Sequence, residues 1–124
     1  LFLKMELLRL SPLSLILVLT GFLFFIAGLI HYYYPPKRIN HFYGYRTKRS
    51  MRNLTVWKFA QTYAAKKMQR LGLYLVVLGL LASAVEIDRM IGTWLAIALV
   101  VLATIPMLLE TEKELKKRFP KDED

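Results

Sequence analysis

Hydrophobic and polar positions are segregated along this chain. Three stretches, residues 10–34, 71–87 and 90–109, contain a single charged residue, Glu86. About 20 apolar residues in an α-helix cross the hydrocarbon core of a bilayer. The pattern therefore predicts three transmembrane helices, the first of them at about 12–34.

Proline and serine mark the ends of the first predicted helix. Ser11 precedes Pro12, a pair typical of a helix start, and Pro35-Pro36 follows the apolar run and stops it. A cleaved signal peptide is the alternative, but the run is long and no clear cleavage site follows it. In the third helix, Pro106 removes one backbone hydrogen bond and predicts a kink.

The second span, 71–87, is short. Long cationic side chains precede it, and they can reach the bilayer surface with their charged ends and so compensate for the short apolar span. These residues are Lys66, Lys67 and Arg70. A tight hairpin over residues 86–89 is expected to lead into the third span.

The polar segment 35–70 is predicted to be a basic cytoplasmic loop with an interfacial helix that begins near Ser50 or Asn53. Apolar positions recur there at helical spacing, with cations on the opposite face, as in helices that lie on a membrane surface. The apolar positions are Leu54, Trp57, Ala60, Ala64 and Leu71.

Residues 110–124 are expected to form a helical cytoplasmic tail that ends at Pro120. Pairs in which an acidic residue is followed four positions later by a basic residue favour this helix. The pairs are Glu112 with Lys116 and Glu114 with Arg118.

Composition agrees with a membrane protein. The hydrophobic fraction is 56% while 22% of residues are charged, and such segregation excludes a soluble enzyme and a disordered chain. The chain has no cysteine, which excludes disulfides, zinc-thiolate sites and cysteine nucleophiles. We predict an all-α integral membrane protein with one domain over residues 1–124, in which residues 1–10 form an interfacial lead-in.

The charge distribution predicts the orientation. The formal net charge is +9, and residues 35–70 hold ten Lys and Arg and no acidic residue. With this loop and the C-terminal tail on one side, that side carries fifteen Lys and Arg against three on the other. The positive-inside rule then predicts a multi-pass protein of the cell membrane with its N-terminus outside and its C-terminus in the cytoplasm.

Catalytic chemistry has little support in the sequence. His31 and His41 are the two histidines, and a carboxylate partner would have to come from Glu110 or Glu112. We therefore expect no enzymatic activity, no cofactor and no metal site, with the histidines as polar side chains at the membrane boundary. A transporter or channel component usually keeps an ionisable residue at mid-depth in a span, and these spans have none.

Glycines recur seven residues apart in the first two spans, at Gly21 and Gly28 and at Gly72 and Gly79. Small residues allow helices to approach closely. The pattern fits packing within one bundle and also fits a homo-oligomer.

The basic loop has three candidate partners. Anionic lipid head groups are the simplest, because each cation near a charged surface contributes about 1 kcal/mol. A docking surface for a protein is the second. Nucleic acid is ranked last, since the aromatic residues share the face of Leu54 and Ala60, which points to lipid or to the bundle.

The run from Asn40 to Lys66, NHFYGYRTKRSMRNLTVWKFAQTYAAK, followed by two hydrophobic spans, resembles the SdpI family of small bacterial and archaeal membrane proteins. Two departures stand out: Lys48 replaces a frequent Pro, and residues 54–56 lack the acidic residues that often precede the Trp. The matching positions are Gly44, Arg46, Thr47, Ser50, Trp57, Lys58 and Ala60.

The resemblance implies an integral membrane protein without known enzymatic activity. The family is named for a member that protects cells from a secreted peptide toxin and takes part in signalling. The resemblance therefore implies that this protein recognises a peptide toxin or a cytoplasmic regulator protein. The alternative function is that of a small oligomeric transporter or channel component. The candidate contacts for a partner or for lipid are the matching positions and Tyr45.

Within this motif, Gly44 is expected to allow a turn and Arg46 to bind backbone carbonyls or a lipid phosphate. Ser50 or Asn53 would cap the next helix, and Trp57 would anchor that helix at the membrane boundary.

Overall fold

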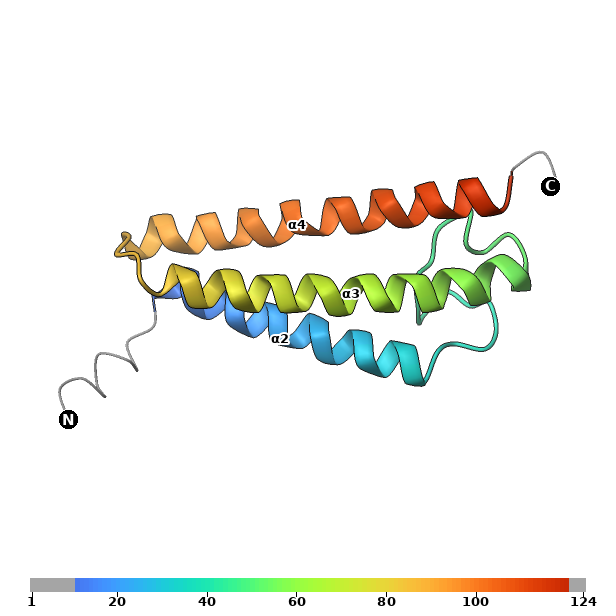
Figure 1. Cartoon of the computed structure of the whole chain (residues 1–124), viewed down its shortest axis with the longest axis horizontal. Coiled ribbons are helices and arrows are strands. Elements are labelled where there is room, and N and C mark those ends of the chain that lie inside the picture. Colours follow the sequence, from blue (N-terminus) through green and yellow to red (C-terminus); the bar gives the residue numbers. More distant parts are fainter. Residues whose placement is uncertain (1–10, 121–124) are drawn as a thin grey trace.

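The computed structural model describes residues 11–120, which form three helices and no strand. The helices are α2 (Pro12–Tyr33), α3 (Leu54–Ala82) and α4 (Arg89–Arg118). They lie side by side, with α3 antiparallel to α2 and α4 (Figure 1). The all-α prediction is confirmed for these residues. The connection between α2 and α3 lies at the same end of the bundle as the C-terminal end of α4, and we call this the loop end.

Short polar side chains start each helix. The Ser11 Oγ accepts a hydrogen bond from the Ser14 N–H at 3.2 Å, and Pro12 occupies the first turn of α2. Asn53, one of the two predicted caps for α3, accepts a hydrogen bond from Val56 N–H at 3.0 Å. These contacts satisfy backbone groups that have no partner within the helix.

The structure does not separate the predicted surface helix from the predicted second span. Residues 54–82 form one helix, α3, because nothing between Asn53 and Ser83 interrupts it and several alanines favour it. The helix also ends earlier than the predicted residue 87. At its end, Ser83 N–H donates to the Leu80 carbonyl at 3.2 Å, so the chain turns there and the hairpin is longer than expected.

Two of the helices, α2 and α4, are long and apolar enough to cross a membrane. Helix α4 continues through Pro106 to Arg118, so the predicted third span and the helical tail form one element. The predicted lead-in at residues 1–10 and the last four residues of the tail lie outside the described part of the chain.

Helices α2 and α3 approach each other through glycine. A Cβ added to Gly72 would lie 2.4 Å from both the Gly21 carbonyl oxygen and the Phe25 amide nitrogen. A Cβ added to Gly79 would lie 2.9 Å from the Val18 nitrogen. The glycine pattern therefore serves packing within this chain, which was the first of its two interpretations.

The buried side chains form two clusters. Leu17 and Leu75 are the centre of the first, which joins all three helices through Ala96 of α4. The second lies at the loop end, where Val56 and Leu115 pack with Tyr45 of the loop. The loop between α2 and α3 is therefore part of the folded core.

Candidate functional site

The loop before α3 is folded by its own side chains. The Asn40 Oδ1 accepts hydrogen bonds from the N–H groups of Phe42 and Tyr43, both at 2.8 Å. The Tyr43 hydroxyl donates to the Tyr34 carbonyl at 2.8 Å. Gly44 has a φ of +109°, and a Cβ there would lie 2.5 Å from the Gln61 Oε1, so the turn predicted at Gly44 requires glycine.

Gln61 of α3 holds the loop through a two-point contact. Its Oε1 accepts a hydrogen bond from the Tyr45 N–H at 2.7 Å, and its Nε2 donates to the Tyr45 carbonyl at 2.8 Å. The same Oε1 lies 2.9 Å from the Nε2 of His31 on α2. Because the oxygen can only accept, the histidine nitrogen is the donor. Gln61 and His31 are both buried, so this network joins α2, the loop and α3 inside the bundle.

Glu112 of α4 gathers three donors from the loop. Its carboxylate accepts from the Tyr45 hydroxyl at 2.5 Å, from the Thr47 hydroxyl at 2.9 Å and from the Arg49 guanidinium at 3.2 Å. Burial raises the pKa of the Tyr45 phenol well above its ordinary value, and the hydrogen bond to Glu112 raises it further, so the phenol stays protonated as a donor. This carboxylate connects the loop to α4.

The two ion pairs predicted within the tail have different outcomes. Arg118 Nε lies 2.7 Å from Glu114 Oε1, which confirms that pair. Glu112 is instead paired with Arg49 of the loop. Sequence spacing indicated a local partner, and the tertiary structure supplies a partner 63 residues away.

Reciprocal hydrogen bonds between Thr47 and Ser50 stabilise a turn within the loop. The Thr47 N–H donates to the Ser50 Oγ at 2.8 Å, and the Ser50 N–H donates to the Thr47 Oγ1 at 3.1 Å. Ser50 Oγ also lies 3.0 Å from the Tyr45 carbonyl, to which it donates. Ser50 is fully buried, so it stabilises the turn and does not cap α3, a role that Asn53 has.

Trp57 and Ala60 do not form a surface contact as predicted. Both are fully buried, because this face of α3 packs against the loop and against α4. The Trp57 Nε1 donates to the Pro36 carbonyl at 2.8 Å. Their place in the motif is therefore explained by packing within the protein.

Two of the eight predicted site residues, Arg46 and Lys58, are exposed at the loop end. The Arg46 guanidinium donates to the His41 carbonyl, one of the two contacts expected for it. Gly44 and Thr47 are half-buried, and Tyr45 is buried with its hydroxyl on Glu112. The motif is thus mostly a structural joint that leaves cationic side chains on the outside.

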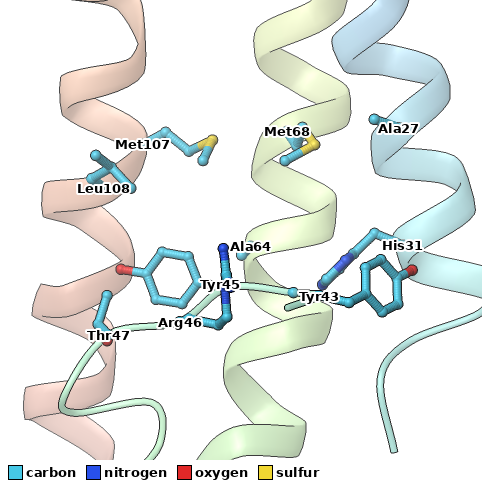
Figure 2. Close-up of a pocket in the computed structure, with 11 residues that line it drawn as sticks. Ala27, His31, Tyr43, Tyr45, Arg46, Thr47, Ala64, Met68, Met107 and Leu108 are labelled. Carbon is cyan, nitrogen blue, oxygen red and sulfur yellow. The ribbon is translucent and has the colours of Figure 1, made fainter. Parts of the chain in front are cut away.

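A cavity of about 430 Å³ lies where the loop meets the three helices. Figure 2 shows Arg46 between Tyr45, which points toward α4, and the His31–Tyr43 pair beside α2, with two methionines above it. Among residues 11–120, no group of three or more His, Cys, Asp or Glu side chains that could hold a metal ion is present. The cavity is lined by Ala27, His31, Tyr43, Gly44, Tyr45, Arg46, Thr47, Ala64, Met68, Met107 and Leu108.

Sequence reasoning missed Gln61. Its signal was available: Gln61 lies one turn after Trp57 and next to Ala60, so a polar amide occurs among the apolar positions of the helix. A polar side chain on a buried face needs partners, and the loop backbone provides them.

Comparison with known proteins identifies relatives of this chain. Residues 37–110 match the SdpI/YfhL protein family. A protein of Bacillus subtilis (strain 168), described as the uncharacterized protein YfhL, is 38% identical over 96 residues, which cover 77% of this chain and 82% of that protein. No solved structure matches significantly. The matched region contains most of the loop with its whole motif, together with α3 and most of α4, and the chain belongs to the SdpI/YfhL protein family.

Proposed function

We propose that this protein is a non-catalytic, three-span membrane protein that recognises a peptide toxin or a cytoplasmic regulator protein, in an immunity or signalling role. The observation that carries the proposal is the folded loop, which is held by hydrogen bonds to α3 and α4 and carries cations on its outside. A surface that is ordered before binding loses little conformational entropy when a partner arrives.

The direction of the helices supports three spans. Helices α2 and α4 point the same way and each is apolar enough to cross a bilayer. If both cross, the chain must return between them, and α3 lies antiparallel alongside them. Its 29 residues correspond to about 44 Å, which is longer than the hydrocarbon core.

The charge distribution supports a cytoplasmic loop end. Seven of the ten cations of residues 35–70 lie in the loop or in the first two turns of α3, and they gather at this end with the basic last turn of α4, as Figure 1 shows for the segments that carry them. The positive-inside rule places such an end in the cytoplasm. The chain has no cysteine, so a single cysteine at Phe42, which is 91% exposed, can report the side. Labelling of this cysteine by an impermeant maleimide added to intact cells would contradict the orientation.

A photo-crosslinking amino acid at Phe42 in living cells tests recognition. We expect one discrete protein or peptide adduct, and we expect Lys48→Glu combined with Lys58→Glu to abolish it without changing the unfolding of the protein. The matched control is the same crosslinker at Tyr74, which is 70% exposed but lies along the apolar half of α3. The absence of a discrete adduct from position 42, or equal adducts from both positions, would contradict the proposal.

The transporter alternative and an enzymatic role have direct tests. Flux of an ion or small solute into liposomes that Tyr74→Phe or Thr104→Val changes would favour transport. In the structure, the Thr104 hydroxyl donates to the Val101 carbonyl of its own helix at 2.7 Å, which is an ordinary contact for a membrane helix. An activity that His31→Ala or His41→Ala removes would favour an enzyme.

A further inference from the structure

The cavity at the loop end has two chemical zones. On the loop side, its wall carries the Arg46 guanidinium, the Tyr43 ring and the Thr47 side chain. On the helix side, it is apolar, and Met68 and Met107 lie above Arg46 in Figure 2. The remaining apolar wall comes from Ala27, Ala64 and Leu108. A cavity with a cationic end and an apolar end, at the end of an apolar helix bundle, is complementary to an amphiphile.

The charge of the cavity selects an anion. Its eleven lining residues include one guanidinium and no carboxylate. The acidic residue nearest to the motif, Glu112, is occupied by Tyr45, Thr47 and Arg49. The Arg46 guanidinium uses Nη1 for the His41 carbonyl, and it has five N–H donors in a planar fork that suits a phosphate.

The backbone of the loop is a poor partner for a peptide at this place. The N–H and carbonyl groups of Tyr45 are both bound by Gln61, and the N–H of Thr47 is bound by Ser50. A peptide that entered the cavity would find these backbone groups already satisfied. An acyl chain needs only apolar contact, and methionine side chains adapt well to such a ligand.

We propose that this cavity binds one anionic membrane phospholipid, with its phosphate on the Arg46 guanidinium and one acyl chain against Met68, Met107 and Leu108. The volume of about 430 Å³ falls in the range of small-ligand sites. Basic pockets between membrane helices on the cytoplasmic side are typical sites for anionic head groups. The site joins α2, α3 and α4 and does not depend on recognition of a protein partner.

Native mass spectrometry of the purified full chain tests the proposal. The protein is prepared in detergent with phosphatidylglycerol or with phosphatidylcholine that has the same acyl chains. We expect at least about tenfold more retention of phosphatidylglycerol, since a hydrogen-bonded charge pair contributes at this level. Arg46→Gln should remove this preference, whereas Lys37→Gln, at an exposed cation of the same loop outside the cavity, should leave it within about twofold.

A second variant keeps Arg46 and fills the apolar end. Ala27 lines the cavity and is exposed, so Ala27→Trp adds a ring there without disturbing buried packing. We expect it to reduce phosphatidylglycerol retention at least about fivefold. Ile26→Trp, at the neighbouring residue outside the cavity lining, is the matched control and should retain the lipid as the unmodified chain does.

Three results would overturn the proposal. Equal retention of the two lipids would exclude selection of an anionic head group. Equal losses for Arg46→Gln and Lys37→Gln, or for Ala27→Trp and Ile26→Trp, would indicate diffuse attraction in place of a site. Displacement of the lipid by inorganic phosphate at the same concentration would show that the site binds a soluble anion and not a lipid.

Discussion

The contact between α2 and α3 and the attachment of α4 follow different physical principles. Helices α2 and α3 meet backbone to backbone at Gly21 and Gly72. Helix α4 has no fully buried residue between Ala96 and Thr111, and along that stretch it packs against the pair through partly buried side chains such as Leu99 and Met107. A contact between glycines is rigid because no side chain can adjust, whereas a contact between long side chains leaves space.

Polar contacts follow the same division. At the α2–α3 contact, the Ser14 hydroxyl donates to the Gly79 carbonyl at 2.7 Å, and Gln69 Nε2 donates to the Gly28 carbonyl at 3.2 Å. Both acceptors belong to glycines, whose carbonyls a neighbouring helix can reach. At α4, the loop is held by Glu112, and Lys67 of α3 pairs with Glu110 at 2.5 Å. Two helices thus form a fixed pair, and the third is attached through side chains.

The largest effect should come from Gly72→Ala. The new Cβ would lie 2.4 Å from backbone atoms of α2, so the helices must separate, and we expect a loss of about 3 kcal/mol in the free energy of unfolding in detergent. Gly92→Ala in α4 is the control. Its Cβ would lie 3.2 Å from the Ile87 Cγ2, and higher helix propensity should leave stability equal or raised by up to about 1 kcal/mol. Equal destabilisation by both would contradict the comparison.

The next effect should come from Gln61→Met, which keeps the approximate volume and removes the contacts to Tyr45 and His31. Buried backbone groups of the loop would lose their partners, so we expect a loss of about 2 kcal/mol, measured by the same unfolding assay. Gln69→Met removes one contact from a half-buried site and should cost about half as much. A smaller effect at Gln61 than at Gln69 would show that the loop is not part of the core.

A smaller effect is expected from Glu112→Ala. Tyr45, Thr47 and Arg49 would lose a shared acceptor, and the loss should be about 1 kcal/mol, seen as a lower unfolding temperature. Glu114→Ala removes an exposed pair with Arg118 and should leave the unfolding temperature unchanged. If both variants unfold alike, the contact between Glu112 and the loop contributes nothing to the attachment of α4.

The smallest effect concerns mobility and not stability. Spin labels at Phe22→Cys and Leu73→Cys report the distance between α2 and α3, and labels at Leu102→Cys and Leu73→Cys report that between α4 and α3. All three positions are exposed. We expect a broader distance distribution for the α4 pair, because no side chain of α4 between Ala96 and Thr111 is fully buried. Equal widths would show that α4 is as firmly packed as α2.

The local rules of helix formation were sufficient for much of the fold. Ser11 and Pro12 start α2, Pro35 ends it, and Asn53 caps α3, as the sequence predicts. These signals act within one helical turn, so they can be recognised without knowledge of the rest of the chain. The segregation of apolar and basic residues could also be recognised from the sequence alone, and it indicated a membrane protein. The motif from Gly44 to Ala60 then identified the family.

The partners of individual side chains were decided by the tertiary structure alone. Glu112 had a suitable cation four residues away and bonds instead with a loop more than 60 residues earlier in the chain. Trp57 had the composition of a boundary anchor and is enclosed because the loop folds over it. Periodicity shows that a helix has an apolar face, but what covers that face depends on how closely the helices approach. In this protein, contacts between glycines far apart in the sequence set that approach for α2 and α3.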